Sequence, residues 1–337
     1  MKTKKIILII LLIVILVGIV LAFAFAGNKK NNSDSKYKLI ASNFASYDFL
    51  RAIIGDNKEV ELTFLLGPGK DAHSYEPTAQ DLIKIQESDL FVYIGGEMEK
   101  WSDKVLNSLE TNKTKKMCIA DFVNTMEEQE IDGAEEEHEH DHNNNEEHHE
   151  EADDHNEEHG EGAFDEHIWT SPENAIKMVN ALEQEMEKVD SQNANIYKDN
   201  ANKYIEQINE VDKRIQEIVD NKVRDRLVFA DKMPMQYFIS YYKLKVSAAF
   251  NGCSTETEPS AKTITYLQNK IKEDKIPVVL YIELNPGRVA QTIANETGTK
   301  AMQIQSLHNI SLDDFNNGET WVSLMTRNID ILKEALQ

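Results

Sequence analysis

The stretch EVELTFLLGPGKDAHSYEPTAQD, residues 59–81, predicts a strand, a turn and a helix in close succession. Residues 59–66 form an apolar run of strand length, and the Gly-Pro-Gly sequence behind it ends the strand. Thr78 and Asp81 have the spacing of a helix N-cap and an acidic residue at the third helical position. The turn between the two elements carries His73. A strand that leads through a loop into a helix is the unit of a mostly parallel α/β sheet.

The same alternation recurs on both sides of this stretch. Further apolar runs of strand length, with helical patterns between them, occupy residues 38–42, 90–94, 116–120, 226–230, 244–250, 276–283 and 300–305. The fold class predicted from this order is α/β, with two lobes that each contain a mostly parallel sheet. We place the first lobe at residues 37–190 and the second at residues 223–337.

Two helices are expected between the lobes. Ser171 followed by Pro172 is typical of an N-cap and first helical residue, and that helix should run to about Val189. A second helical run, at residues 193–219, keeps apolar residues three and four positions apart over about seven turns. This spacing fits a surface helix packed along one stripe and equally a rigid connector at residues 191–222.

The N-terminal segment, residues 1–36, indicates export. Lys2, Lys4 and Lys5 precede an uncharged apolar run over residues 6–26, and Ala24-Phe25-Ala26 fits a cleavage site. The run is also long enough to span a bilayer, so a cleaved signal peptide and an uncleaved anchor fit equally well. Either one puts the body of the protein outside the cytoplasm, at the cell surface or secreted.

The charge of the chain is concentrated in one segment. The net charge is −23, and 20 acidic residues lie between Glu127 and Glu166, where the sequence has no Lys or Arg. This distribution argues against a nucleic-acid partner and favours cations. Residues 127–164 lack apolar periodicity and are expected to be a disordered insertion in the first lobe.

Seven histidines lie in this insertion, and we interpret it as an auxiliary loop that collects metal weakly, with a solvated spacer as the alternative. These residues are His138, His140, His142, His148, His149, His155 and His159. Because each binding event must order the loop, tight binding is expected elsewhere.

The three remaining histidines, His73, His167 and His308, each lie in a loop at the edge of an expected strand or helix. Ligand crevices of parallel sheets form at the carboxyl ends of the strands, and neutral imidazole suits zinc. Three such histidines therefore suggest a metal site, although a single loop histidine is usually a surface or structural residue.

Three motifs resemble one known family. HSYEPT (residues 73–78), DEHIWTSPENA (165–175) and TEPS (257–260) recur in this order together with the acidic, His-rich insertion. The pattern is similar to the substrate-binding proteins of zinc/manganese ABC importers and covers about residues 37–337. The resemblance implies two α/β lobes joined by a long rigid helix, with one metal ion in the cleft between them. It also implies that a non-enzymatic extracytoplasmic protein captures Zn²⁺ and delivers it to a membrane permease.

The chain departs from this family at two ligand positions. The position of the third ligand falls on Lys232, whose ammonium group cannot ligate a cation while protonated. The fourth falls near Gln305, with His308 three residues further on. We therefore expect His73, His167 and His308 to bind the metal, with Asp231, Glu256 or water as the fourth donor. Glu258 is a further carboxylate of the second lobe, and Lys232 is expected to pair with a carboxylate near the cleft.

Several alternatives remain open at this point. Manganese is the alternative cargo, and a metal-dependent surface adhesin uses a similar scaffold. A secreted zinc hydrolase is less favoured because none of the expected helices carries a paired His–Glu motif. We expect a monomer. Two separate buried thiols are favoured over a disulfide for Cys118 and Cys253.

Overall fold

The computed structural model describes residues 36–109, 113–134, 164–252, 254 and 258–337. The expected signal or anchor segment, the seven histidines of the acidic insertion, Cys253 and Glu256 lie outside these residues. Within the described part of the chain, none of the helices combines the length and the hydrophobicity needed to cross a membrane.

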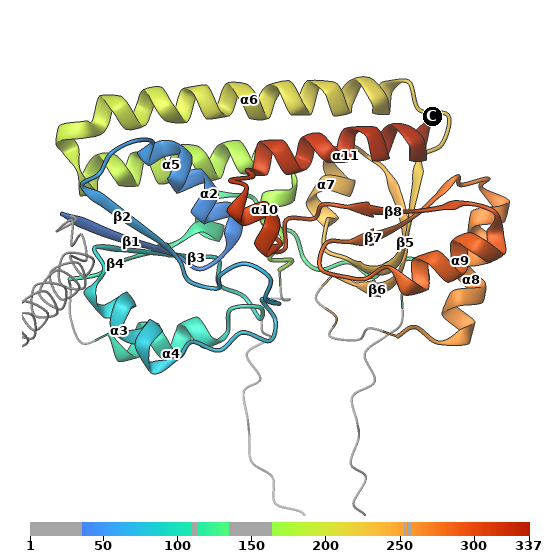
Figure 1. The fold of residues 1–337 in the computed structure, drawn as a ribbon, viewed down its shortest axis with the longest axis horizontal. Helices are drawn as coiled ribbons and strands as arrows, with labels where there is room; N and C mark the ends of the chain where they lie inside the picture. The colour runs from blue at the N-terminus through green and yellow to red at the C-terminus, as the bar shows by residue number, and fades with distance from the viewer. Residues whose placement is uncertain (1–35, 110–112, 135–163, 253, 255–257) are drawn as a thin grey trace, which may run out of the picture.

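The first lobe contains a four-stranded parallel sheet with the strand order β2-β1-β3-β4. Its strands are β1 (Tyr37–Ala41), β2 (Val60–Phe64), β3 (Leu90–Tyr93) and β4 (Lys115–Cys118). Its helices are α2 (Phe44–Ile54), α3 (Ala79–Glu87), α4 (Trp101–Ser108) and α5 (Pro172–Val189). Figure 1 shows α3 and α4 on one face of this sheet and α2 and α5 on the other. Successive residues of β1 point to opposite faces of the sheet. Ile40 packs in the core beneath α3 and α4, and Leu39 packs in the core on the opposite face.

The second lobe repeats this plan with the strand order β6-β5-β7-β8, again parallel throughout. Its strands are β5 (Arg226–Met233), β6 (Lys245–Asn251), β7 (Val278–Ile282) and β8 (Lys300–Ile304). Its helices are α7 (Gln236–Tyr241), α8 (Ala261–Glu273), α9 (Arg288–Thr297), α10 (Leu312–Asn316) and α11 (Trp321–Leu336). One face of the sheet packs against α8 and α9, and the other against α7 and α11.

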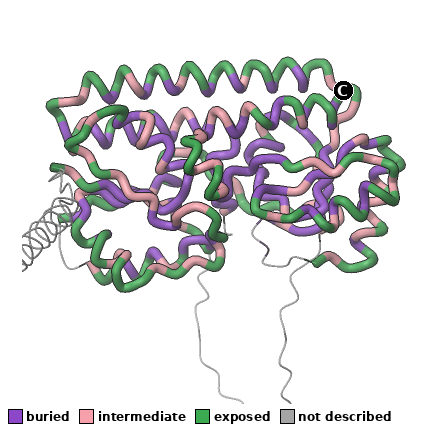
Figure 2. Tube along the Cα trace, in the orientation of Figure 1, coloured by how far each residue is buried: buried purple, intermediate pink, exposed green. Residues whose placement is uncertain are grey.

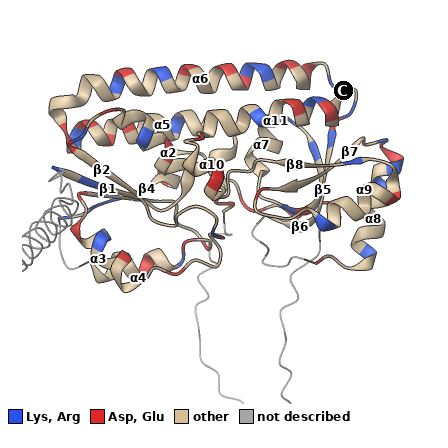
Figure 3. Ribbon diagram, in the orientation of Figure 1, with Lys and Arg blue, Asp and Glu red and all other residues tan. Residues whose placement is uncertain are grey.

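The connector is α6 (Ala194–Asp220), which lies across both lobes (Figure 1). Its 27 residues span about 40 Å at the rise of an α-helix. The residues of its buried stripe keep a three- and four-residue spacing and are Tyr197, Ala201, Tyr204, Ile208, Val211, Ile215, Ile218 and Val219. The opposite side of α6 is exposed and carries charges of both signs (Figures 2 and 3). The stripe belongs to one hydrophobic core that continues from the first lobe into the second.

A buried carboxylate joins α2, α6 and α11. Asp48 on α2 accepts hydrogen bonds from the hydroxyl of Tyr204 on α6 and from the backbone N–H of Trp321 at the start of α11, the latter at 2.7 Å. Arg51 pairs with the same carboxylate at 2.5 Å and donates to the carbonyl of Glu319 at 2.6 Å. These contacts fix α2 of the first lobe and α11 of the second lobe to the connecting helix α6.

A polar segment, residues 126–133, forms a second link between the lobes, which we call the strap. It leaves the first lobe after β4 and contacts α7, where the backbone N–H of Met126 donates to Tyr237 Oη at 3.0 Å. At its far end Asp132 pairs with Arg226 at 3.0 Å and forms an isolated parallel bridge with Ser247. The strap therefore covers part of the free edge of β6.

The strap corrects one expectation from the sequence. Disorder was expected over all of residues 127–164, whereas residues 127–134 and Phe164 have defined partners, including an antiparallel bridge between Glu127 and Phe164. These residues show no apolar periodicity because hydrogen bonds to the second lobe hold them, and only the single apolar side chains of Ile131 and Phe164 pack against the core. Residues 135–163 lie outside the described part.

The other expected elements agree with the structure. All eight expected strands are present, and each is shifted by at most three residues at either end. Thr78 and Asp81 form a reciprocal capping box, and Ser171 caps α5 with Pro172 in its first turn. Cys118 is a free thiol that donates to the carbonyl of Ile94 at 3.1 Å.

The substitution Tyr204→Phe tests the link at Asp48. Loss of the hydroxyl removes one hydrogen bond to a buried carboxylate, and we expect the free energy of unfolding of the metal-free protein to fall by about 2 kcal/mol. Urea denaturation followed by circular dichroism measures this change. Tyr241→Phe is the matched control, because Tyr241 also donates to a carboxylate, Asp212, but is only half-buried. Equal stability losses in both variants would contradict the importance of the Asp48 link.

Candidate metal centre

His73 comes from the first lobe, in the loop between β2 and α3. The preceding turn is closed by Asp71, whose Oδ1 accepts the backbone N–H of His73 at 2.9 Å. The capping box of α3 fixes the other end of the loop. His73 is half-buried, and its Nε2 atom is buried without a hydrogen-bond partner.

His167 lies directly before the short 3-10 helix η2 (Ile168–Thr170), which leads into α5, and is fully buried. Asp165 Oδ1 accepts both its backbone N–H, at 2.8 Å, and its ring Nδ1–H, at 3.0 Å. Tyr237 of the second lobe donates to the carbonyl of Asp165 at 2.7 Å. Because a carboxylate only accepts, Asp165 holds the proton on Nδ1 and leaves the lone pair of Nε2 free.

His308 follows β8 in the second lobe and is buried. The turn before it is fixed by the buried Glu283, which accepts from the backbone N–H of Ser306 at 2.7 Å and from its hydroxyl at 2.8 Å. Leu307 has a φ of 58°, a left-handed conformation that is costly for a leucine. This backbone strain is maintained immediately beside a candidate ligand.

The three histidines meet between the lobes. Each offers one ring nitrogen, and these three atoms all lie within 4.8 Å of one another. His167 Nε2 is 3.1 Å from His308 Nδ1, and the rings of His73 and His308 stack with centroids 5.0 Å apart. Nitrogens that bind one tetrahedral zinc lie about 3.3 Å apart, so side-chain shifts of at most about 1.5 Å complete the cluster.

The environment favours neutral rings, which are the metal-binding form. Burial, reinforced by the neighbouring histidines, lowers the pKa of His73 to about 3. Burial also lowers the pKa of His308. The lone pairs of these rings are therefore available at neutral pH without first losing a proton to solvent.

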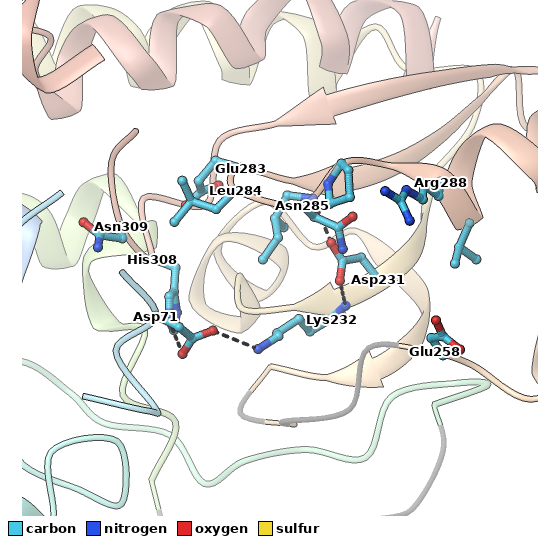
Figure 4. Close-up of a pocket in the computed structure, with 13 residues that line it drawn as sticks. Asp71, Asp231, Lys232, Glu258, Glu283, Leu284, Asn285, Arg288, His308 and Asn309 are labelled. Carbon is cyan, nitrogen blue, oxygen red and sulfur yellow. Dashed lines mark hydrogen bonds and ion pairs between the residues drawn. The ribbon is translucent and has the colours of Figure 1, made fainter. Parts of the chain in front are cut away.

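Of the carboxylates named from the sequence, Asp231 and Glu258 are among the described residues and Glu256 is not. Asp231 is buried, and its oxygens accept the backbone N–H groups of Lys232, at 2.9 Å, and Ile282, at 3.3 Å. It is not part of the three-histidine group found among the described residues. Asp231 and Glu258 instead line a cavity of about 340 Å³ that opens beside His308 (Figure 4).

Three carboxylates that support the cluster were not proposed as site residues from the sequence: Asp71, Asp165 and Glu283. Asp165 begins the motif DEHIWTSPENA, and its position two residues before His167 is a signal from which its supporting role could be predicted. Asp71 has the same spacing from His73. The role of Glu283 depends on contacts across 23 residues and leaves no local signal. Lys232 pairs with a carboxylate near the cleft, as expected, and the partner is Asp71 at 3.5 Å.

Asp165→Asn tests the support of His167. The amide keeps an acceptor for the backbone N–H but removes the charge that orients and polarises the imidazole, so zinc affinity should fall about 10- to 100-fold. A competition titration against a chromogenic chelator measures the affinity. Asp103→Asn, on the exposed side of α4, should leave it unchanged. If Asp165→Asn binds zinc as tightly as the parent protein, Asp165 does not support His167 as a zinc ligand.

Comparison with known proteins identifies the family of the chain. Residues 39–335 match the model of the family described as zinc-uptake complex component A, periplasmic. The high-affinity zinc uptake system protein ZnuA of Bacillus subtilis is 30% identical over 321 residues, which cover 94% of each chain. The zinc-binding lipoprotein AdcA of Streptococcus pneumoniae is 29% identical over 313 residues, 93% of this chain and 58% of AdcA. The chain thus spans somewhat more than half the length of that relative.

A solved structure extends this similarity to the fold. The Zn(II)-bound ZnuA-like domain of Streptococcus pneumoniae AdcA superimposes with a TM-score of 0.70 and 26% identity, over 89% of this chain and 98% of that domain. The family model covers most of the chain, and the chain belongs to the ZnuA family of zinc-uptake components.

Proposed function

We propose that the protein is an extracytoplasmic, non-enzymatic zinc-binding protein that captures Zn²⁺ between its lobes and delivers it to an ABC-type membrane importer. The observation that carries this proposal is the convergence of three buried or half-buried imidazoles from both lobes. Relatives named as zinc-binding and zinc-uptake proteins support the same cargo.

The donor set favours zinc over manganese. His73, His167 and His308 supply three nitrogens, and water or a nearby carboxylate supplies the fourth position. Imidazole-rich ligation suits zinc, whereas manganese prefers a site richer in oxygen. A site that leaves one position to an exchangeable ligand also suits a cargo that must be released.

The partner and the location follow from the same proposal. The importer requires a membrane permease, which receives the ion from a protein that acts as a monomer outside the cytoplasm. The apolar segment at residues 6–26 provides either the export signal or the membrane anchor. The acidic insertion supplements the main site by collecting cations weakly.

Substitution of the candidate ligands tests the main site. In metal-free protein titrated with zinc, His308→Ala and His167→Ala should each lose at least about 100-fold in affinity, since removing a ligand costs more than removing its support. Native mass spectrometry should show one tightly bound ion in the parent. Zinc at a thousandfold excess over the parent's dissociation constant should stabilise the parent by about 4 kcal/mol and these variants by at most about 1.4 kcal/mol. Parental zinc binding by His308→Ala would refute the assignment of this residue.

Deletion of residues 135–163 separates the insertion from the main site. The shortened protein should keep one high-affinity binding event in calorimetry, because His73, His167 and His308 are all retained, and should lose only the weaker, multiple binding. The parent protein is the control in the same titration. Complete loss of tight binding would show that the insertion supplies essential ligands.

A further inference from the structure

Asp71 lies where the two lobes touch beside the metal centre. The loop that carries it is docked on the second lobe: Gly69 N–H donates to the carbonyl of Ile310 at 2.8 Å, and Asn309 Nδ2 donates to the carbonyl of Gly67 at 3.0 Å. The carboxylate of Asp71 faces two residues of the second lobe, His308 and Lys232 (Figure 4).

The two oxygens of Asp71 face different partners. Oδ2 lies 3.5 Å from Lys232 Nζ, and Oδ1 lies 3.9 Å from His308 Nε2. The Lys232 side chain is only 12% exposed, whereas that of Asp71 is 46% exposed.

The geometry also indicates which nitrogen of His308 meets the metal. Its Nδ1 is 3.1 Å from His167 Nε2, close to the spacing of two nitrogens on one zinc ion. Without metal, this short contact is a hydrogen bond from His308 Nδ1–H to the lone pair of His167. A zinc ion bound by both atoms requires a lone pair on His308 Nδ1, so the proton must then reside on Nε2. That atom is buried without a hydrogen-bond partner and faces Asp71.

We propose that Asp71 is the positioning carboxylate of His308, which binds zinc through Nδ1, and that Lys232 weakens this support by sharing Asp71. The inference rests on the proposed function. In the zinc-bound protein Asp71 accepts Nε2–H of His308, as Asp165 accepts Nδ1–H of His167. A carboxylate in this position makes an imidazole a stronger ligand.

Lys232 opposes that effect through charge. The positive charge of its ammonium group draws electron density of the Asp71 carboxylate toward Lys232. The carboxylate is then a weaker hydrogen-bond acceptor for His308, and His308 is a weaker ligand of zinc. Because Asp71 is half-exposed, solvent screens this interaction, and the effect on affinity is modest. Lys232 thereby sets the zinc affinity below the value that the three histidines and two carboxylates would otherwise give.

Three variants of the full-length, metal-free protein test the proposal by zinc titration against a competing chelator. Asp71→Asn keeps the acceptor that closes the His73 turn, loses the charge, and should weaken zinc about 10- to 100-fold. Lys232→Met should tighten zinc roughly fivefold. In the double variant, the gain from Lys232→Met should vanish, because Lys232 acts through Asp71. Lys245→Met, which breaks the Lys245–Asp225 pair at the opposite end of the sheet, should match the parent.

Nitrogen NMR of histidine-labelled, zinc-bound protein gives an independent readout. We expect His308 to ligate through Nδ1 and to carry a proton on Nε2 whose signal shifts in Asp71→Asn. Ligation through Nε2, or parental affinity in Asp71→Asn, would overturn the proposal. A gain from Lys232→Met that persists in the double variant would show direct repulsion of zinc and also overturn it. A failure of the proposed zinc-binding function can be told apart from a failure of the Asp71 proposal, because the parent protein itself would then bind no zinc tightly.

Discussion

The candidate metal centre depends on the fixed separation of two sheets, and the buried stripe of α6 sets that separation. Neither lobe holds more than two of the three histidines. Because α6 packs on α2 and α5 in one lobe and on α11 of the other, one continuous core lies beneath both. The eight buried side chains of α6 cannot shift by one helical turn without losing their packing. The packing of α6, at a distance from the histidines, therefore fixes the relative positions of His73, His167 and His308.

Polar contacts add to the packing of the core in fixing the placement of the two lobes. The Asp48 cluster joins the three helices, and the loop at residues 67–70 is bonded to residues 309 and 310. The strap adds a third link and places Asp132 on the edge of β6, while its start lies beside Tyr237, the same side chain that holds Asp165. The strap therefore connects the base of the acidic insertion to the support of His167. Two hydrogen bonds lead from the strap through Tyr237 to Asp165, and a third joins Asp165 to the His167 ring.

The sequence predicts most of this fold because its signals are local. Thr78 with Asp81, and Ser171 with Pro172, identify helix starts without any tertiary contact, and the spacing along residues 193–219 identifies the buried stripe. The three histidines are identifiable because so few lie outside the insertion. The strap and the role of Glu283 are not predictable in this way, since both depend on hydrogen bonds between residues far apart in the chain. For Lys232, the sequence indicates a missing ligand and a carboxylate partner but not which carboxylate.

The identity of that carboxylate changes how the position of Lys232 is understood. A lysine at a position where the family resemblance implies a ligand is a defect if only the ligands are counted. In the structure its ammonium group lies against Asp71, which also faces His308 and closes the turn at His73. The Asp71 carboxylate thus contacts residues of both lobes, including the candidate ligands His73 and His308. The ammonium group of Lys232 lies next to this carboxylate and so acts on both ligands through it. A protein that must bind an ion and then give it up needs an affinity that is bounded from above as well as from below. By the proposed role of Lys232, a charge placed one contact away from the ligands would lower the affinity without removing a donor or changing the geometry of the site.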